Sequence, residues 1–228
     1  MFKGKIGVEI EGFLPLNKRE DVCNSMVDLG WNFGGDGSII PPENNHGVEF
    51  RSEVYSLENL DELFNATQKL FKDLKVNNSC GLHIHLSFKD LVNYYKISEW
   101  GFVEQFQNNI IELFKTETEK KRLTNHFCAL YKDQKDFNDS INMCLSTRCK
   151  GGYRYKAVNY NAYSLYRTIE FRIFPATYKI ENFKKYVMFL VNNVNNFIDS
   201  NQLNPVDVQC SNIKQPKPLI SIRMGVKK

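Results

Sequence analysis

Four segments of this chain carry charged or imidazole side chains at alternate positions, the spacing at which side chains leave one face of a β-strand. The four sets are Glu9 and Glu11; Glu49, Arg51 and Glu53; His83 and His85; and Glu170 and Arg172. Apolar residues alternate with them in each segment. If the segments share one sheet, one face packs the core. The other face then gathers carboxylates, imidazoles and guanidinium groups in one polar depression.

Such a depression would need compensating ions. Two carboxylates about 5 Å apart repel each other by about 3 kcal/mol at an effective dielectric constant near 20. Divalent cations relieve that repulsion, and glutamate oxygens with one or two imidazoles favour Mg²⁺ or Mn²⁺. Zinc more often takes cysteine or several histidines. Arginines beside such ions indicate a phosphate group that needs neutralising.

Each short pattern by itself also has an ordinary structural explanation. Glu9 and Glu11 alone are typical of a solvated strand face. For the pair His83 and His85 alone, a metal or phosphate contact and an ordinary surface position are about equally good explanations. The two glutamate–arginine patterns alone are typical of ion pairs on a sheet. The hypothesis of a metal site depends on the presence of all four patterns in one chain.

Hydrophobic periodicity predicts the elements that must position these residues. Strands are expected at residues 5–13, 47–55, 80–88 and 168–175, and two short strands are expected around the turn at residues 34–38. Helices are expected at residues 17–29, 57–74, 97–114, 117–131 and 180–198, with residues 115–122 charged and exposed. The segment 132–150 gives no clear pattern. This order predicts the α+β class with a mostly antiparallel sheet.

Length and composition narrow the class of protein. A chain of 228 residues suits one domain of moderate size. We expect that catalytic domain over residues 1–200, with a helical or loop insertion at 115–150 and a tail at 201–228 that wraps the domain or is partly mobile. The net charge of +4 does not indicate a nucleic-acid binder, and no apolar run is long enough to cross a bilayer. Six scattered cysteines and the absence of a secretory signal at the start predict a cytoplasmic protein with reduced thiols.

An ordered set of short motifs resembles the amidoligase family. The motifs are GVEIE at 7–11, DGS at 36–38, GVEFRS at 47–52, CGLHIHL at 80–86, RYKAVN at 154–159 and TIEFR at 168–172. The resemblance runs from about Gly7 to about Phe197. The histidine motif is also similar to a segment of glutamine synthetase. The resemblance implies a curved antiparallel sheet with helices packed on one face, as in the catalytic domain of glutamine synthetase. It also implies a carboxylate–amine ligase of the superfamily that includes glutamine synthetase and glutamate–cysteine ligase.

The resemblance further implies cofactors and residue roles. The cofactors would be ATP and Mg²⁺ or Mn²⁺, with the metal held by Glu9, Glu11, Glu49, His83 and Glu170. His85 and Arg172 would face the ATP phosphates, and Arg51, Arg154 and Asn159 would lie near the nucleotide or substrate. Asp36 and Ser38 would lie toward the substrate end. Of these residues, Arg172, His85 and Asp36 would take part in catalysis.

Two positions depart from the family pattern. Glu53 follows Ser52 where the family often has proline, and Arg167 precedes Thr168 where the family usually has glycine. Neither position is an implied metal ligand. The departures therefore concern the edge of the pocket and the choice of substrate.

The implied reaction has two steps. A substrate carboxylate attacks the γ-phosphorus of ATP to give an acyl phosphate, and an amine then displaces phosphate to form an amide. The amine needs a base, for which Asp36, Glu43 and Glu53 are candidates. The substrates would be a small-molecule or peptide carboxylate and an amine. The sequence leaves their identity open, allows a homo-oligomer and indicates neither a nucleic-acid nor a membrane partner.

Other functions fit parts of the pattern. A hydrolase of the amidohydrolase type would need further histidines, only His46 and His126 remain, and the chain is short for a (β/α)₈ barrel. A cupin would need a glutamate soon after His85, which the sequence lacks. A non-catalytic nucleotide- or metal-binding protein and a phosphotransferase on the same fold stay open.

Overall fold

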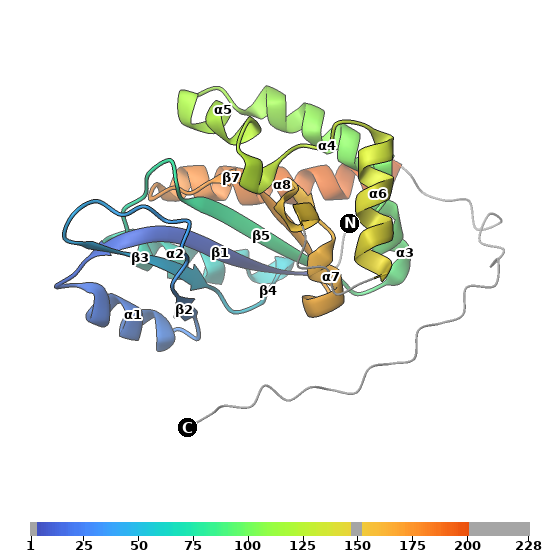
Figure 1. The fold of residues 1–228 in the computed structure, drawn as a ribbon. Helices are drawn as coiled ribbons and strands as arrows, with labels where there is room; N and C mark the ends of the chain where they lie inside the picture. The colour runs from blue at the N-terminus through green and yellow to red at the C-terminus, as the bar shows by residue number, and fades with distance from the viewer. Residues whose placement is uncertain (1–3, 147–151, 201–228) are drawn as a thin grey trace.

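One antiparallel sheet runs through the computed structural model, which describes residues 4–146 and 152–200 (Figure 1). Its strands are β1 (Gly4–Pro15), β2 (Asn32–Gly34), β3 (Asn45–Arg51), β4 (Tyr55–Ser56), β5 (Gly81–Phe88), β6 (Val158–Asn159) and β7 (Ile169–Pro175). Neighbouring strands follow the order β2-β3-β1-β5-β7-β6, and β4 also pairs with β1. The predicted α+β class with an antiparallel sheet is therefore confirmed.

The strand β1 lies inside the sheet and organises it. It pairs with β3 and β5 along most of its length, and its first residues also pair with β4. Ile6, Val8 and Ile10 are each 2 % exposed or less. Because side chains alternate along a strand, the residues between them point to the opposite face. One strand thus contributes both to the core and to the polar face.

Helices cover the core face of the sheet. The helices α2 (Leu60–Leu70), α4 (Trp100–Leu113) and α8 (Ile180–Ser200) pack large apolar side chains against it. Phe64 of α2 meets Phe183 of α8 edge-on, and Phe106 of α4 meets Phe171 of β7. Figure 1 shows α2 and α8 behind the sheet. Burial of each such side chain contributes about 1.5–3 kcal/mol, so this face fixes which side chains remain on the other one.

Shorter helices connect these parts. They are α1 (Arg19–Val27), α3 (Leu91–Ile97), α5 (Glu117–Leu123), α6 (Gln134–Ser146) and α7 (Asn161–Tyr166), with single turns η1 (Leu57–Asn59), η2 (His126–Cys128) and η3 (Gly152–Tyr155). The helices α5 and α7 and the turn η2 all contact β7. Within the described ranges, no helix has both the length and the apolar character needed to span a membrane.

Several predicted boundaries need correction. The helix expected at residues 97–114 starts at Trp100 after the separate helix α3, and the one expected at 117–131 ends at Leu123. The chain turns there because the Asn125 side chain accepts the N–H of Phe127 and begins η2. Around the turn at 34–38 only the strand β2 forms in the described chain. The helix expected at 17–29 does end near Gly30, whose φ is +80°.

The segment 115–122 is not uniformly exposed as predicted. Glu119 and Arg122 are 4 % and 6 % exposed. The Glu119 carboxylate accepts hydrogen bonds from Lys185 Nζ and Tyr186 Oη of α8 at 3.0 and 2.9 Å. These contacts turn one side of α5 toward the body of the domain. In the segment 132–150, α6 covers residues 134–146; residues 147–151 and the predicted tail at 201–228 lie outside the described residues.

Candidate active site

The register of β1 brings three of the four sequence patterns together. Glu9 stands opposite His83 of β5, and Glu11 stands opposite Glu49 of β3. Residues directly opposite each other project from the same face of a sheet. The predicted convergence of β1, β3 and β5 on one polar face is therefore present.

The strand β7 brings the fourth pattern to the same face. Glu170 stands opposite His85 of β5 and also opposite Asn159 of β6. The pairing of β5 with β7 shifts between Leu82 and Ile84, which marks an irregularity beside His83. A bulge of this kind re-aims side chains locally and is common next to active sites.

Glu9, His83 and Glu170 form what we call the first donor group. His83 Nδ1 lies 3.2 Å from Glu9 Oε2 and 3.4 Å from Glu170 Oε1. One potential ligand atom of each residue lies within 4.8 Å of the others. His83 is 3 % exposed and Glu170 is 5 % exposed, so little water reaches these charges.

Glu11, Asp36 and Glu49 form the second donor group, with ligand atoms again within 4.8 Å of one another. Asp36 comes from the loop after β2, where Asp36 Oδ1 accepts hydrogen bonds from the backbone N–H and the hydroxyl of Ser38. Glu11 Oε2 accepts the N–H of Gly81 at 2.6 Å. The sequence assigned Asp36 to the substrate end; the structure places it beside two of the expected metal ligands.

Both groups have the donor chemistry of a site for hard divalent cations. Each offers several carboxylate oxygens, and the first adds one imidazole nitrogen. Mg²⁺ and Mn²⁺ prefer such ligands. Buried carboxylates at these separations repel one another without a cation between them. The residues present therefore fit a divalent metal.

The pKa values of the carboxyl groups move in opposite directions. Burial raises the pKa of Glu9, but the neighbouring His83 and His85 imidazoles outweigh burial and hold that pKa well below the usual range. Burial and the neighbouring charge of Glu9 raise the pKa of Glu49. Burial also raises the pKa of Asp36, but the hydrogen bonds from Ser38 more than offset it and lower that pKa. Divergent shifts among adjacent carboxyl groups are typical of functional sites.

His85 turns a buried nitrogen toward the first donor group. Its Nδ1 lies 3.1 Å from Thr168 Oγ1, which fixes the ring. Its Nε2 lies 3.4 Å from Glu9 Oε1 and 4.0 Å from Glu170 Oε1, yet makes no hydrogen bond within the described chain. Burial lowers the pKa of His85, but the two carboxylates outweigh burial and raise it. An orphaned buried nitrogen in this position suits an additional ligand.

Two arginines bind the donor groups directly. Arg172 donates from Nη1 to Glu170 Oε1 and from Nε to the carbonyl of Phe127, the latter at 3.3 Å. Arg51 donates from Nε to Glu49 Oε1. Both guanidinium groups therefore bring positive charge to the edge of an acidic cluster, a placement that suits an anionic ligand.

A cavity of about 340 Å³, which we call the central cavity, opens on this face. Predicted site residues that line it are Glu11, Asp36, Ser38, His83, Arg154 and Arg172. The other lining residues are Gly37, Ser79, Arg122, Asn125, Phe127 and Tyr155. The cavity therefore joins the second donor group to a rim of cations and aromatic rings.

The remaining predicted residues lie outside the lining of this cavity. Asn159 is buried and donates from Nδ2 to Glu170 Oε2 at 2.6 Å, so it positions that carboxylate. Arg51 lies beside Glu49 with 47 % of its side chain exposed. Glu43 and Glu53, two candidate bases, are exposed and do not line the central cavity. Of the three candidate bases, only Asp36 does.

Sequence reasoning missed Arg122, Asn125 and Thr168 as site residues. Thr168 belongs to a quoted motif, but its bond to His85 depends on strand register. Arg122 and Asn125 come from α5 and the loop after it, and nothing in their spacing distinguishes them from a solvated helix end. Only the Thr116–Glu119 capping box gives a local signal that α5 begins where it does.

One comparison with known proteins identifies a family for this chain. A family model described as "Putative amidoligase enzyme" matches residues 16–194. This range contains Asp36, Glu49, His83 and Glu170 and begins just after β1. Searches of curated proteins and of solved structures gave no match.

Proposed function

This chain belongs to the amidoligase family, and from that membership we propose that it is an ATP- and Mg²⁺-dependent ligase joining a carboxylate to an amine. Mn²⁺ would serve in place of Mg²⁺. We further propose that the sheet is related to the catalytic domain of glutamine synthetase. Membership of this family supports an enzyme of the ligase class. The use of ATP, the use of a divalent metal and the reaction mechanism are our proposals.

The observation that carries this proposal is the pair of donor groups on one open sheet face. Five carboxylates and His83 supply two neighbouring clusters, which is more acidic oxygen than one structural ion needs. Pairs of divalent ions are a common device for phosphoryl transfer. The adjoining arginines suit the phosphates that such ions would accompany.

Each donor group would hold one divalent ion. The first would use Glu9, His83 and Glu170, and the second would use Glu11, Asp36 and Glu49. Bound ions would neutralise charge on the nucleotide phosphates and on the transferred phosphoryl group. In this assignment Asp36 is a metal ligand, and Asn159 acts by positioning Glu170.

The protein's own cations would complete the phosphate site. His85 Nε2 is a buried ring nitrogen without a hydrogen-bond partner in the described residues, and Arg172 borders the central cavity. Both would bind phosphoryl oxygens and stabilise the charge that develops during transfer. Arg154, at the rim of the central cavity, would contact nucleotide or substrate, and Arg51 would add positive charge beside Glu49.

The proposed reaction balances in two steps. A carboxylate oxygen of the substrate forms a bond to the γ-phosphorus as the bond to ADP breaks, which gives an acyl phosphate. The amine nitrogen then forms a bond to the acyl carbon, inorganic phosphate leaves, and a base takes the proton from nitrogen. Burial of the donor groups would limit hydrolysis of the acyl phosphate by water.

Thermal melting with ATP and ADP-release assays test this function. ATP at about 100 times its Kd adds about 2.7 kcal/mol to the free energy of unfolding. We expect ATP to raise Tm by about 5 °C or more when Mg²⁺ is present, and far less when Mg²⁺ is replaced by EDTA. Amide formation, ADP and phosphate should appear in equal amounts with the correct pair of acid and amine.

Two outcomes would contradict the proposal. If ATP does not raise the Tm with either Mg²⁺ or Mn²⁺, ATP is not the nucleotide that the protein uses. A stable phosphorylated product without an amide, across a screen of amino acids, polyamines and peptides, would instead identify a phosphotransferase.

A further inference from the structure

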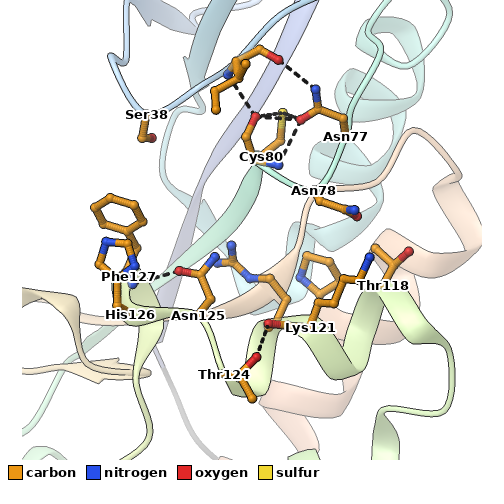
Figure 2. A pocket seen from close by; sticks show the side chains of 14 residues that line it. Ser38, Asn77, Asn78, Cys80, Thr118, Lys121, Thr124, Asn125, His126 and Phe127 are labelled. Atoms are coloured by element: carbon orange, nitrogen blue, oxygen red, sulfur yellow. Dashed lines mark hydrogen bonds between the residues drawn. The ribbon is translucent and has the colours of Figure 1, made fainter.

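A second cavity of about 350 Å³, which we call the side cavity, adjoins the central cavity. The two share the lining residues Ser38, Ser79, Arg122, Asn125 and Phe127. Figure 2 shows the side cavity between α5, the loop before β5 and the loop carrying Ser38. A small molecule that bridges the shared residues would therefore reach from the side cavity to the donor groups.

The two cavities differ in charge. The central cavity is lined by Glu11 and Asp36 as well as by arginines. None of the described residues that line the side cavity is aspartate or glutamate, whereas Lys121 and Arg122 both line it. Its other polar lining consists mainly of side-chain amides and hydroxyl groups, which accept or donate hydrogen bonds without charge. The side cavity is thus a cationic space next to an acidic one.

Arg122 is buried without a direct carboxylate partner among the described residues. The residue is 6 % exposed, and its Nη2 and Nε donate to the carbonyls of Arg172 and Ile173 at 2.7 and 3.4 Å. In the described part of the chain, no carboxylate oxygen lies within 4.0 Å of its guanidinium group, and Nη1 makes no hydrogen bond. The Nη1 group is therefore left to donate to an anionic ligand at this position.

Gly81 explains how Arg122 comes so close to the donor groups. A Cβ on Gly81 would lie 3.0 Å from Arg122 Nη2, 3.1 Å from His83 Nε2 and 3.3 Å from Glu11 Oε2. The three side chains therefore converge on the space that glycine leaves free. Arg122 borders both the side cavity and the second donor group, so one ligand can contact both.

We propose that the side cavity binds a second carboxylate of the acid substrate, so that the substrate is a small molecule with at least two carboxylates. This inference rests on the proposed ligase function. One carboxylate would be held by Arg122 and Lys121, while the other would extend past the shared residues toward the metals, where it is activated. The guanidinium group can bind a carboxylate through two parallel hydrogen bonds.

The charge of the side cavity disfavours cationic occupants. Protonated polyamines would meet Lys121 and Arg122 with no carboxylate in the lining to balance them. Inorganic phosphate shares the anionic chemistry of a carboxylate, so the test must separate the two. The affinity for a dicarboxylate should depend on its second carboxylate, and inorganic phosphate should compete only weakly with the dicarboxylate.

Calorimetric titration with glutarate, butyrate, putrescine and inorganic phosphate, in the presence of Mg²⁺ and ADP, tests the inference. We expect glutarate to bind about tenfold or more tightly than butyrate, because the second carboxylate gains charge-assisted hydrogen bonds. Putrescine should not displace glutarate. Tighter binding of phosphate than of any dicarboxylate from succinate to adipate would overturn the inference.

Lys121→Glu provides the decisive variant, because Lys121 is exposed and the change should not affect folding. Charge reversal should weaken glutarate binding about tenfold. Lys120→Glu is the matched control: its ammonium pairs with Glu117, and the residue does not line the side cavity. Equal glutarate affinity in the two variants would overturn the inference.

Arg122→Lys adds a second test that retains the charge but loses the planar pair of donors. It should lower glutarate affinity about tenfold while butyrate affinity changes less. The wild-type response to ATP and Mg²⁺ is measured separately. If ATP with Mg²⁺ does not raise the Tm of wild type, the ligase proposal is contradicted. If ATP does raise the Tm but dicarboxylates bind no more tightly than butyrate, only this inference is contradicted.

Discussion

His83 Nε2 lies 3.5 Å from Glu11 Oε1, although the two residues belong to different donor groups. The other ring nitrogen, Nδ1, faces Glu9 and Glu170. One imidazole therefore stands between the two acidic clusters. A neutral imidazole accepts through one nitrogen and donates through the other, so a cation bound to Nδ1 in the first donor group would direct the Nε2 hydrogen toward Glu11 of the second group.

Removal of this imidazole should therefore weaken metal binding at both groups. We expect His83→Ala to lower Mn²⁺ affinity at least about tenfold, as is usual when a group that ligates or orients a metal is lost. Calorimetric titration with Mn²⁺ measures this. His46→Ala is the control, because His46 is an exposed histidine on β3 of the same sheet. Loss at one group alone would argue against the coupling.

Glu170 offers a direct test of turnover. Glu170→Gln keeps the shape of the side chain, and the amide can still bond to Asn159, but the charge that would hold the proposed cation is gone. We expect ADP release to fall by about 10²-fold or more while the circular dichroism spectrum persists. Undiminished turnover in both Glu170→Gln and His83→Ala would exclude the proposed site.

Asn159 should reveal how the site is positioned. Its Nδ2 donates to Glu170 Oε2, and its Oδ1 accepts the N–H of Asn161 at 3.0 Å. Asn159→Asp would place a second carboxylate against Glu170, so the metal-free protein should melt at a lower temperature. Mn²⁺ should restore more stability to this variant than to wild type. If Mn²⁺ gives both proteins the same gain in Tm, Glu170 does not face the cation.

Gly81 should tolerate no side chain without loss of function. Gly81→Ala brings a methyl group within 3.1 Å of His83 Nε2, closer than ordinary contact, so the imidazole must move. We expect a loss of stability of about 1 kcal/mol and weaker Mn²⁺ binding. Gly35→Ala is the control, since nothing lies within 4 Å of its added methyl group. Identical Mn²⁺ titrations for the two variants would refute this account.

Glu119 should make the protein sensitive to acid. Burial raises the pKa of Glu119, but hydrogen bonds from the Thr116 backbone and from Lys185 and Tyr186 outweigh it and lower the pKa to about 2. A carboxyl with a lowered pKa stabilises the folded state above about pH 4.5, and this contribution is lost as pH falls toward 2. Glu119→Gln should lower the free energy of unfolding by about 1–3 kcal/mol at pH 7.

The pH dependence supplies the check on that assignment. Urea unfolding of wild type and Glu119→Gln at several pH values should show the difference between them shrinking as the solution is acidified below pH 4.5. A difference that stays constant down to pH 2 would mean that the carboxylate charge is not the source of the stability.

The polar face could be predicted from sequence because it depends only on the period of a strand. Once Val8 and Ile10 are assigned to the core, Glu9 and Glu11 must share the other face, and the same reasoning holds for His83. No partner strand needs to be known for this step. The α+β class with an antiparallel sheet could be predicted from the order of strands and helices along the chain.

The second donor group and the side cavity could not be predicted in this way. Asp36 comes from a loop, and loop paths are set by tertiary contacts such as the bonds from Ser38. Arg122 read as part of a charged, exposed segment, because nothing local shows that Glu119 will be held by Lys185 and Tyr186, 66 and 67 residues further on. Long-range contacts of this kind decide which helix face is buried.

The position of β1 inside the sheet makes folding and chemistry inseparable. If its alignment slipped by one residue, Glu9 and Glu11 would turn inward and Val8 and Ile10 would face the polar side of the sheet. A substitution that caused this shift would reduce the stability of the fold together with the activity. Selection against misfolded chains would then guard the acidic face of this strand even at times when the reaction itself was under no selection.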